Sequence, residues 1–167
     1  KGTQILPTYH PSALLRDETG EKKREAWQDM KALRDRMKEM GIYPGQEVEA
    51  DGKKVRLARL QEECAAYFNE LYAPDQKVYV FGDGDPQARV MLVGEAPGAQ
   101  EALLGKPFVG KAGKNLDEFL ERTELKRAEL YITNTVKFRP VKISDKGRAS
   151  NRTPTREEIG LFLPWLQ

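Results

Sequence analysis

The sequence contains few of the side chains that most often bind metal ions, with one cysteine and one histidine among 167 residues. Cys64 therefore has no second cysteine with which to form an internal disulfide. A single thiolate also cannot supply a zinc finger or the four ligands of an ordinary iron–sulfur cluster. We therefore predict a cytoplasmic protein that uses no metal and no other cofactor.

Long hydrophobic runs are also missing. No apolar segment is long enough to span a membrane, and no signal peptide is visible at the start. The hydrophobic content of 39% suits one soluble domain that can bury a core. The net charge is only +2, so total charge does not indicate a nucleic-acid binder, although the distribution of charge can still do so.

A segment rich in proline, glycine and charge divides the chain. We predict that this segment, residues 43–56, links residues 1–42 to residues 57–167, and that the two flanking portions together form one domain. Within the first portion, residues 21–40 place apolar side chains every three or four positions. This spacing predicts an amphipathic helix that ends at Gly41.

Short apolar patterns predict the remaining elements. Gln4–Tyr9 has β-type residues, and its proline favours a strand end or edge. Cys64 lies at helical spacing among apolar residues, which favours core packing over a reactive thiol. Lys77–Phe81 and Arg89–Gly94 predict two strands joined by the turn GDGDPQ, residues 82–87.

The order of strand, glycine-rich turn, helix and strand predicts a βαβ unit. Residues 116–120 favour a helix, and Leu130–Asn134 favours a second buried strand. Functional groups in parallel sheets gather at the carboxyl ends of strands, where both Glu95 and Asn134 fall. We therefore expect a pocket at this edge of the sheet.

The residues around the glycine-rich turn leave several interpretations open. The sequence GEAPG has neither the glycine spacing of a dinucleotide-binding fingerprint nor the GK[ST] of a P-loop, and it fits either a pocket of backbone donors or a plain tight turn. Phe108 could stack on a flat base or fill the core, and Asn134 could read a ligand or bond a neighbouring backbone. For His10, the residues alone favour a structural role.

Basic residues concentrate between positions 137 and 156. Seven basic residues oppose one acid there, giving a local charge of +6 next to the strand that carries Asn134. Such a segment is suited to hold a polyanion backbone near the pocket, although solvated loops can also be basic. Thr155 and Glu158 come next with the spacing of a capping box, which predicts the start of the last helix.

Four ordered motifs carry a family resemblance. They are VMLVGEAPGAQEALLGKPFVGKAG (90–113), YITNTVKFRP (131–140), NRTPTREEI (151–159) and LPTYHPSALL (6–15). Together they resemble the uracil-DNA glycosylases of the family 4 type. The resemblance implies a three-layer α/β/α sandwich with a short parallel sheet. It also implies hydrolysis of the N-glycosidic bond of deoxyuridine in DNA, which releases uracil during base excision repair.

The resemblance also implies roles for the pocket residues. Phe108 would stack on the extruded base, Asn134 would recognise its edge, and His10 would donate to uracil O2 as the base departs. Ala96 lies in the uracil-binding set, and it follows Glu95 at the position where the family 1 enzymes have an aspartate. A strong aspartate general base is therefore absent.

Two carboxylates complete the implied catalytic set. Glu95 and Glu101 would both face the pocket, one positioning water or stabilising the sugar cation, the other guarding the space of the thymine methyl. The resemblance does not divide these roles between them, and Asn151 would assist. The implied DNA-binding residues are Ser12, Leu14, Arg16, Lys106, Lys111, Lys137, Arg139 and Arg152, the first three resembling a loop that enters the minor groove.

The sequence departs from the family pattern in three ways. Many members bind an iron–sulfur cluster through four cysteines, but Phe138 and residues 161–163 stand where cysteines are expected, which implies a cluster-free branch. The HPS motif, which lies near the carboxyl terminus in the family, comes first here. A strand and helix between these two ends also have no match, so we expect an incomplete or permuted sheet in which the strand before His10 lacks its neighbour.

These departures and the residue content leave alternatives open. The chain could be a window across a tandem or permuted glycosylase, a rearranged sequence, or a fragment completed by another segment or chain, and its oligomeric state is not predicted. The alternatives to an enzyme are a non-catalytic nucleic-acid or nucleotide-binding module of the same fold, or an inactive fragment. A nucleotide-handling enzyme of another class would need a metal or triphosphate motif, and the sequence shows none.

Overall fold

The computed structural model describes residues 3–41, 50–72 and 77–166, without the side chains of Pro11, Ser12, Ala50 and Asp51. The helices are α1 (Pro11–Leu14), α2 (Glu21–Glu39), α3 (Ala50–Leu71), α4 (Ala99–Leu104), α5 (Lys111–Arg122) and α6 (Arg156–Phe162). The strands are β1 (Gly82–Gly84), β2 (Met91–Gly94), β3 (Tyr131–Asn134), β4 (Val141–Ile143) and β5 (Ala149–Asn151). In the described part of the chain, no helix combines the length and apolar character needed to cross a membrane.

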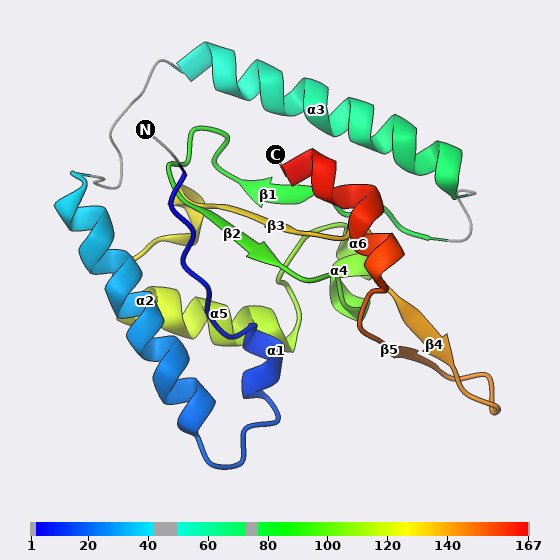
Figure 1. The fold of residues 1–167 in the computed structure, drawn as a ribbon, viewed down its shortest axis with the longest axis horizontal. Coiled ribbons are helices and arrows are strands. Elements are labelled where there is room, and N and C mark those ends of the chain that lie inside the picture. The colour runs from blue at the N-terminus through cyan, green and yellow to red at the C-terminus, as the bar shows by residue number, and fades with distance from the viewer. Residues whose placement is uncertain (1–2, 42–49, 73–76, 167) are drawn as a thin grey trace.

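A small sheet lies between helices, which confirms the predicted α/β class. Figure 1 shows α2 and α5 on one side of the sheet, and α3 and α6 on the other. The strand order is β1-β3-β2, with β2 and β3 parallel as the βαβ pattern predicts. The sheet is mixed, whereas the resemblance implies a short parallel sheet, because β1 pairs antiparallel with β3.

Strand β1 forms where the sequence predicts a turn, and the preceding run Lys77–Phe81 is not a strand. Glycine explains the difference, because β1 approaches β3 too closely for side chains. A Cβ added to Gly82 would lie 2.8 Å from Tyr131 Cζ, and one added to Gly84 would collide with the carbonyl oxygen of Leu130. Turn propensity in the GDGDPQ sequence is therefore overridden by tertiary contact.

The predicted strand Gln4–Tyr9 does not form, since residues 3–9 have no regular structure and are exposed. Side-chain bonds to α2 hold this segment instead. Thr8 Oγ1 donates to Asp29 Oδ2 at 2.6 Å, and Arg36 Nε donates to Gln4 Oε1 at 3.0 Å. Among the described residues, no strand pairs with the outer edge of β2.

The predicted helices form, with one boundary moved. Helix α2 covers residues 21–39 of the expected 21–40, and the Thr155–Glu158 capping box starts α6, with Glu158 N donating to Thr155 Oγ1 at 3.1 Å. Helix α3 begins at Ala50, so residues 50–56 of the predicted linker are helical. Residues 43–49, the remainder of that linker, lie outside the described residues.

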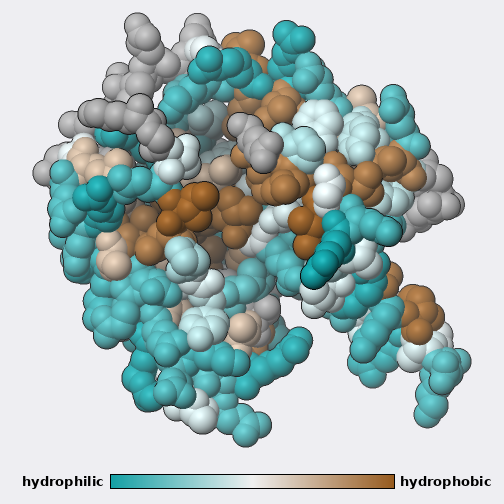
Figure 2. All heavy atoms as spheres, viewed as in Figure 1, coloured by the Kyte–Doolittle hydropathy of each residue, from teal (hydrophilic) through white to brown (hydrophobic). Residues whose placement is uncertain are grey.

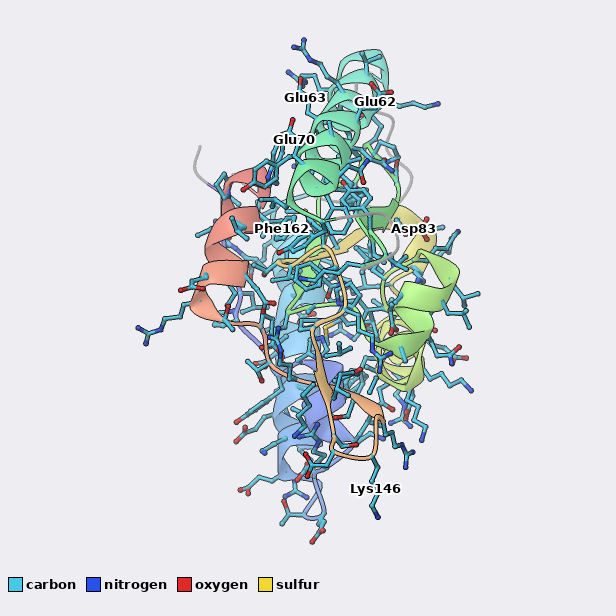
Figure 3. All side chains as sticks on the ribbon, turned by 90° about the vertical axis from the view of Figure 1, so that its right-hand side faces the viewer. Glu62, Glu63, Glu70, Asp83, Lys146 and Phe162 are labelled. Carbon is cyan, nitrogen blue, oxygen red and sulfur yellow. The ribbon has the colours of Figure 1, made fainter. Side chains whose placement is uncertain are left out.

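Two hydrophobic cores occupy the two sides of the sheet. The first joins α1 and α2 to α5 and β3, and its most deeply buried members include Ala26, Leu120 and Ile132. Because α1 and α2 share this core with α5, segments from both sides of the predicted linker pack together. The second core lies under α3 and α6, contains Cys64 as predicted, and is otherwise largely aromatic, with Phe162 turned inward from α6 (Figure 3).

Lys137 corrects a sequence expectation, because its side chain is 1% exposed and does not face DNA. Its Nζ donates to the carbonyl oxygen of Asn134 at 2.7 Å and to Thr133 Oγ1 at 2.8 Å. It also lies 4.9 Å from the centre of the Phe81 ring. The lysine therefore satisfies oxygens at the carboxyl end of β3, where the strand gives way to a loop.

We predict that the stability contributed by Lys137 depends on pH. Burial lowers the pKa of its amine to about 8 from an ordinary 10.5, so the folded state disfavours the charged form. This destabilisation is fully present below about pH 8 and disappears as the pH rises through the pKa that Lys137 has in the unfolded chain. The free energy of unfolding therefore increases by about 3 kcal/mol over this range. Denaturant unfolding should show the wild type gaining this amount relative to Lys137→Met between about pH 7 and 11. A pH-independent difference would contradict the assignment.

Candidate functional site

The carboxyl end of β2 brings three segments together at Gly94. Gly94 is opposite Asn134 in the parallel β2–β3 register. A Cβ added to Gly94 would collide with Asn134 Oδ1 and would lie 2.6 Å from Phe108 Cζ. The backbone of Gly94 is therefore in direct contact with the Asn134 amide and the Phe108 ring, which only glycine permits.

Asn134 ends β3 with its amide held inside the protein. The residue is 2% exposed, and its Oδ1 has no hydrogen-bond partner among the described residues. Its main-chain oxygen, by contrast, accepts from Lys137 Nζ. A buried acceptor without a partner costs about 1–3 kcal/mol, so this oxygen is a strong candidate for receiving an N–H group from a ligand.

Phe108 is held in an unusual backbone conformation beside this amide. Its φ is +54°, in the left-handed region that non-glycine residues rarely adopt. Arg127 Nη2 donates to its carbonyl oxygen at 3.0 Å, and that oxygen lies where a side chain on Gly113 would collide. The ring is buried rather than displayed on an exposed loop, and its centre is 5.3 Å from that of the His10 ring.

His10 reaches the same site from the amino-terminal segment, directly before α1. Its ring is half-buried, and this burial lowers its pKa below the ordinary 6.5, while the negative charge of Glu101 acts in the opposite direction. The neutral ring is therefore the main form at neutral pH, and neutral imidazole carries one N–H donor. His10 and Asn134 therefore both lie next to Phe108.

Glu101 joins two glycine-rich turns. Its buried carboxylate accepts from the backbone nitrogens of Gly98 at 3.1 Å, Val109 at 2.9 Å and Gly110 at 2.7 Å. Charge-assisted bonds of this kind fix the turns on both sides of α4. Glu95 lies in a different environment, exposed directly after β2. The sequence could not distinguish the two carboxylates. In the structure Glu101 is buried and binds the backbone of both turns, whereas Glu95 faces solvent.

Asn151 and Ala96 take different positions around the turn. Asn151 Oδ1 accepts from Arg139 Nε at 2.7 Å, and its Nδ2 is 3.4 Å from the position of a Cβ on Gly98. Asn151 therefore adjoins the GEAPG turn from strand β5. The side chain of Ala96 packs against the second core, so contact between this residue and a base in the site would come from its backbone.

The expected DNA-binding residues divide into exposed and engaged groups. Arg16 and Lys111 are exposed, and Lys106 forms an exposed ion pair with Asp83 at 3.5 Å. Arg152 is engaged within the protein, with two bonds of 2.6 and 2.7 Å to the carboxylate of Glu158. These bonds hold the pKa of Glu158 at about 2. The side chain of Ser12 lies outside the described residues.

Leu14 and Lys137 cannot act as surface DNA contacts, since both side chains are buried. Leu14 is 7% exposed within the first core, whereas the adjacent Leu15 is 50% exposed. The short helix α1 explains this, because it turns one leucine of the pair inward and leaves the next outside. Leu15 is therefore the leucine of this loop that is available to a partner.

The antiparallel pair β4 and β5 was not predicted, because the sequence there was interpreted as a basic loop. The signal was present in the alternation of Val141, Lys142 and Ile143 before the turn residues around Gly147. Gly147 has a φ of +72°, and its nitrogen donates to the carbonyl oxygen of Ser144 at 2.8 Å. This is the geometry of a short hairpin turn closed by a left-handed glycine.

The residues present do not fit an iron–sulfur cluster. The chain has one cysteine, and no group of three or more His, Cys, Asp or Glu side chains in the described ranges could hold a metal ion. Phe138 and Phe162 stand at or next to the positions where the resemblance leads one to expect cysteines. Both are fully buried, with ring centres 6.0 Å apart, and each also contacts Phe68.

Comparison with known proteins gives one family. The model of the uracil DNA glycosylase superfamily matches residues 81–167. A type-4 uracil-DNA glycosylase of Pyrobaculum aerophilum is 47% identical over 91 residues, covering 54% of this chain and 42% of that protein. Those of Archaeoglobus fulgidus and Thermotoga maritima are 48% and 44% identical over 81 and 79 residues, covering 48% and 47% of this chain.

These matches confirm the predicted resemblance over part of the chain. The matched part spans only 42%, 37% and 37% of the lengths of the three relatives. The family match includes Asn134, Phe108 and both carboxylates but begins after His10. The proximity of His10 to this set therefore rests on the geometry of the structure.

We predict that His10 titrates below its ordinary pKa of 6.5, because burial disfavours the imidazolium. It is the only histidine, so its ring protons give isolated signals in an NMR titration. The Phe108→Ala variant should return the midpoint toward 6.5, because removing the neighbouring ring admits water. The urea-unfolded protein provides the control. A midpoint in the folded protein at or above that of the unfolded protein would refute the assigned environment.

Proposed function

The chain belongs to the uracil DNA glycosylase superfamily, and from this premise we propose that it hydrolyses the N-glycosidic bond of deoxyuridine in DNA, releasing uracil and leaving an abasic site. The observation that carries the proposal is the buried Oδ1 of Asn134, which lies against Gly94 beside the Phe108 ring and lacks a partner among the described residues. Cytoplasmic base excision repair is the setting proposed for this activity.

Asn134 supplies the selectivity in this proposal. Its Oδ1 accepts from the N3–H of uracil while its amide nitrogen donates to O4. Cytosine presents an acceptor at N3 and a donor at N4, the opposite pattern. A site built to pair with one pattern rejects the other strongly, because mismatched buried groups stay unpaired. Lys137 keeps Asn134 in place by binding its main-chain oxygen.

The target base must leave the helix to reach a site this deeply buried. Extrusion costs a few kcal/mol, and less at a mismatch or in a single strand. The Phe108 ring gives the extruded base a flat apolar surface, fixed by its backbone bond from Arg127. Because Gly94 has no side chain, the Phe108 ring lies directly against its backbone at the end of β2.

His10 stabilises the departing base. Negative charge grows on uracil as the glycosidic bond breaks and the sugar becomes cationic in character. The half-buried ring carries one N–H donor in its neutral form, which burial favours by lowering the pKa. Donation from that N–H to uracil O2 places a fixed dipole where charge develops.

The two carboxylates divide the remaining work. Glu95 is exposed directly after β2, where it can orient water toward the sugar carbon or face the sugar cation. Glu101 uses both oxygens to bind backbone nitrogens, so it acts as a positioning residue for the turns that form the site. Asn151 adjoins the same turn and assists its placement.

Contacts with DNA outside the site come from exposed residues on several elements. Arg16, Lys106 and Lys111 provide cations for phosphates, and Leu15 replaces Leu14 as the apolar residue offered to the vacated stack. Arg139 and Arg152 are bonded to Asn151 and Glu158, so they support the surface and add to its positive field.

One experiment separates this function from a binding module of the same fold. That alternative is worth testing because the matched part covers less than half of each named relative. An oligonucleotide with one uracil is incubated with the protein and then treated with alkali, beside the same oligonucleotide with thymine. Cleavage only at uracil supports the glycosylase, whereas binding without alkali-labile sites supports the module.

We predict that Asn134→Ala lowers the rate of uracil excision at least about 100-fold, equivalent to about 2.7 kcal/mol, because both bonds to the base edge are lost. Asn69→Ala, at an exposed position on α3, is the matched control and should retain the wild-type rate. The measurement is single-turnover excision with protein in excess. An unchanged rate in Asn134→Ala would rule out the proposed recognition of uracil by Asn134.

We also predict that Gly94→Ala lowers excision at least about 100-fold, because the added methyl group displaces the Asn134 amide and the Phe108 ring. Gly160→Ala is the control, since a Cβ at that helical position meets nothing within 4 Å. It should excise normally and unfold at the same or a slightly higher temperature. Normal excision by Gly94→Ala would show that the close approach at β2 is not needed.

A further inference from the structure

The β4–β5 hairpin projects from the body of the protein and buries none of its side chains. Every residue from Val141 to Asn151 is exposed. Figure 1 shows the hairpin extending away from the sheet, and Figure 3 shows Lys146 at its far end. A segment that contributes to neither core is not explained by folding, so its residue pattern points to a partner.

The hairpin is fixed at its base. Arg152 Nε donates to the carbonyl oxygen of Val141 at 3.1 Å, and the same guanidinium forms its two short bonds with Glu158 at the start of α6. Arg139 bonds Asn151 across the other side of the base. At the tip, Ser144 N donates to the carbonyl oxygen of Arg148 at 3.1 Å. The projection is therefore a braced element with a closed turn.

The two faces of the hairpin differ in chemistry. Val141 pairs with Asn151, Lys142 with Ser150, and Ile143 with Ala149. Cross-strand partners share a face and successive residues alternate, so Val141, Ile143 and Ala149 lie on the face of Asn151. Lys142 and Ser150 lie on the other face, to which alternation also assigns Arg148. Figure 2 shows hydrophobic atoms on this projection among hydrophilic ones.

The apolar face is continuous with the candidate site. Asn151, at its base, places its Nδ2 near Gly98 in the turn held by Glu101. From Asn151 the face continues outward to Val141 and then to Ile143, which are 37% and 63% exposed. The cations Lys142, Lys146 and Arg148 oppose a single acid on the hairpin, Asp145. Apolar groups on one face of the hairpin, with cations on the other face and at the tip, match unstacked bases attached to a phosphate backbone.

We propose that the β4–β5 hairpin is a finger that holds single-stranded DNA beside the site, with Val141 and Ile143 against unstacked bases and Lys142, Lys146 and Arg148 toward phosphates. This inference rests on the proposed function for its choice of DNA. Bases in an intact duplex hide their faces in the stack, so the apolar contacts form only with single-stranded or locally opened DNA. The cations contact either form.

The test measures affinity for undamaged DNA, which does not require glycosylase activity. Fluorescence anisotropy with a thymine-containing strand of about 15 nucleotides, and with its duplex, compares Ile143→Ser with Val55→Ser. Val55 is the matched control, because it is β-branched and also 63% exposed, on α3. Ile143→Ser should bind the single strand about fivefold more weakly and the duplex nearly as the wild type does, whereas Val55→Ser should bind both normally.

A second variant tests the cationic face. Replacing Lys142, Lys146 and Arg148 with glutamine should reduce the salt dependence of single-strand binding by a slope of about 2. Unfolding temperatures close to that of the wild type verify the fold, since all these side chains are exposed. Wild-type affinity in Ile143→Ser, or an equal loss on duplex and single strand, would overturn the proposed finger. Failure of the wild type to excise uracil would instead overturn only the proposed glycosylase function.

Discussion

The buried carboxylate of Glu101 is the interaction on which the site depends. Two turns rich in glycine, before and after α4, have few side chains of their own to hold them. Three backbone N–H groups from these turns converge on Glu101, so one residue fixes both. A carboxylate is suited to this work because it accepts several bonds, and each is strengthened by its charge. The position of Phe108 is fixed as a result, since the second turn continues directly from its backbone.

The site also depends on the close approach of side chains to the backbone of β2 where it pairs with β3. Gly94 has no side chain, so the Asn134 amide and the Phe108 ring meet over its backbone. The same asparagine is held through its main chain by Lys137, whose burial costs the protein stability at neutral pH. The buried amine of Lys137 and the buried Oδ1 of Asn134, which has no partner among the described residues, are both unfavourable for folding alone. Their occurrence within one short segment is consistent with a site shaped for a ligand.

Sequence patterns predicted local features well, but they predicted poorly which side chains are buried and which segments pair as strands. The capping box at Thr155, the helix that starts at Glu21 and the strand ends at Gly94 and Asn134 arise from periodicity and turn chemistry, which act over a few residues. The burial of Lys137 and Leu14 was not predictable, because each depends on which way an adjacent element turns. Strand β1 was missed for a related reason. Its glycines signal a turn locally but permit a strand once Tyr131 covers them.

The sequence motifs indicate which residues belong to the candidate site, but not how each residue is buried and bonded there. The motifs brought together Phe108, Asn134 and His10, and the structure places these side chains around one point. Nothing in the sequence distinguishes Glu95 from Glu101, because both are glutamates near the same turn. Their difference arises from which one the folded turns surround.

The hairpin and the residues of the candidate site are attached to the protein in very different ways. Gly94, Asn134 and Phe108 tolerate little change, since each is enclosed by the others. The hairpin is joined to the body through Arg139 and Arg152 and adds nothing to either core. Its length and composition can therefore drift through evolution, or be exchanged by design, with little cost to folding. The proposed base recognition and the proposed contact with single-stranded DNA thus belong to separate parts of the protein, so one can change without altering the other.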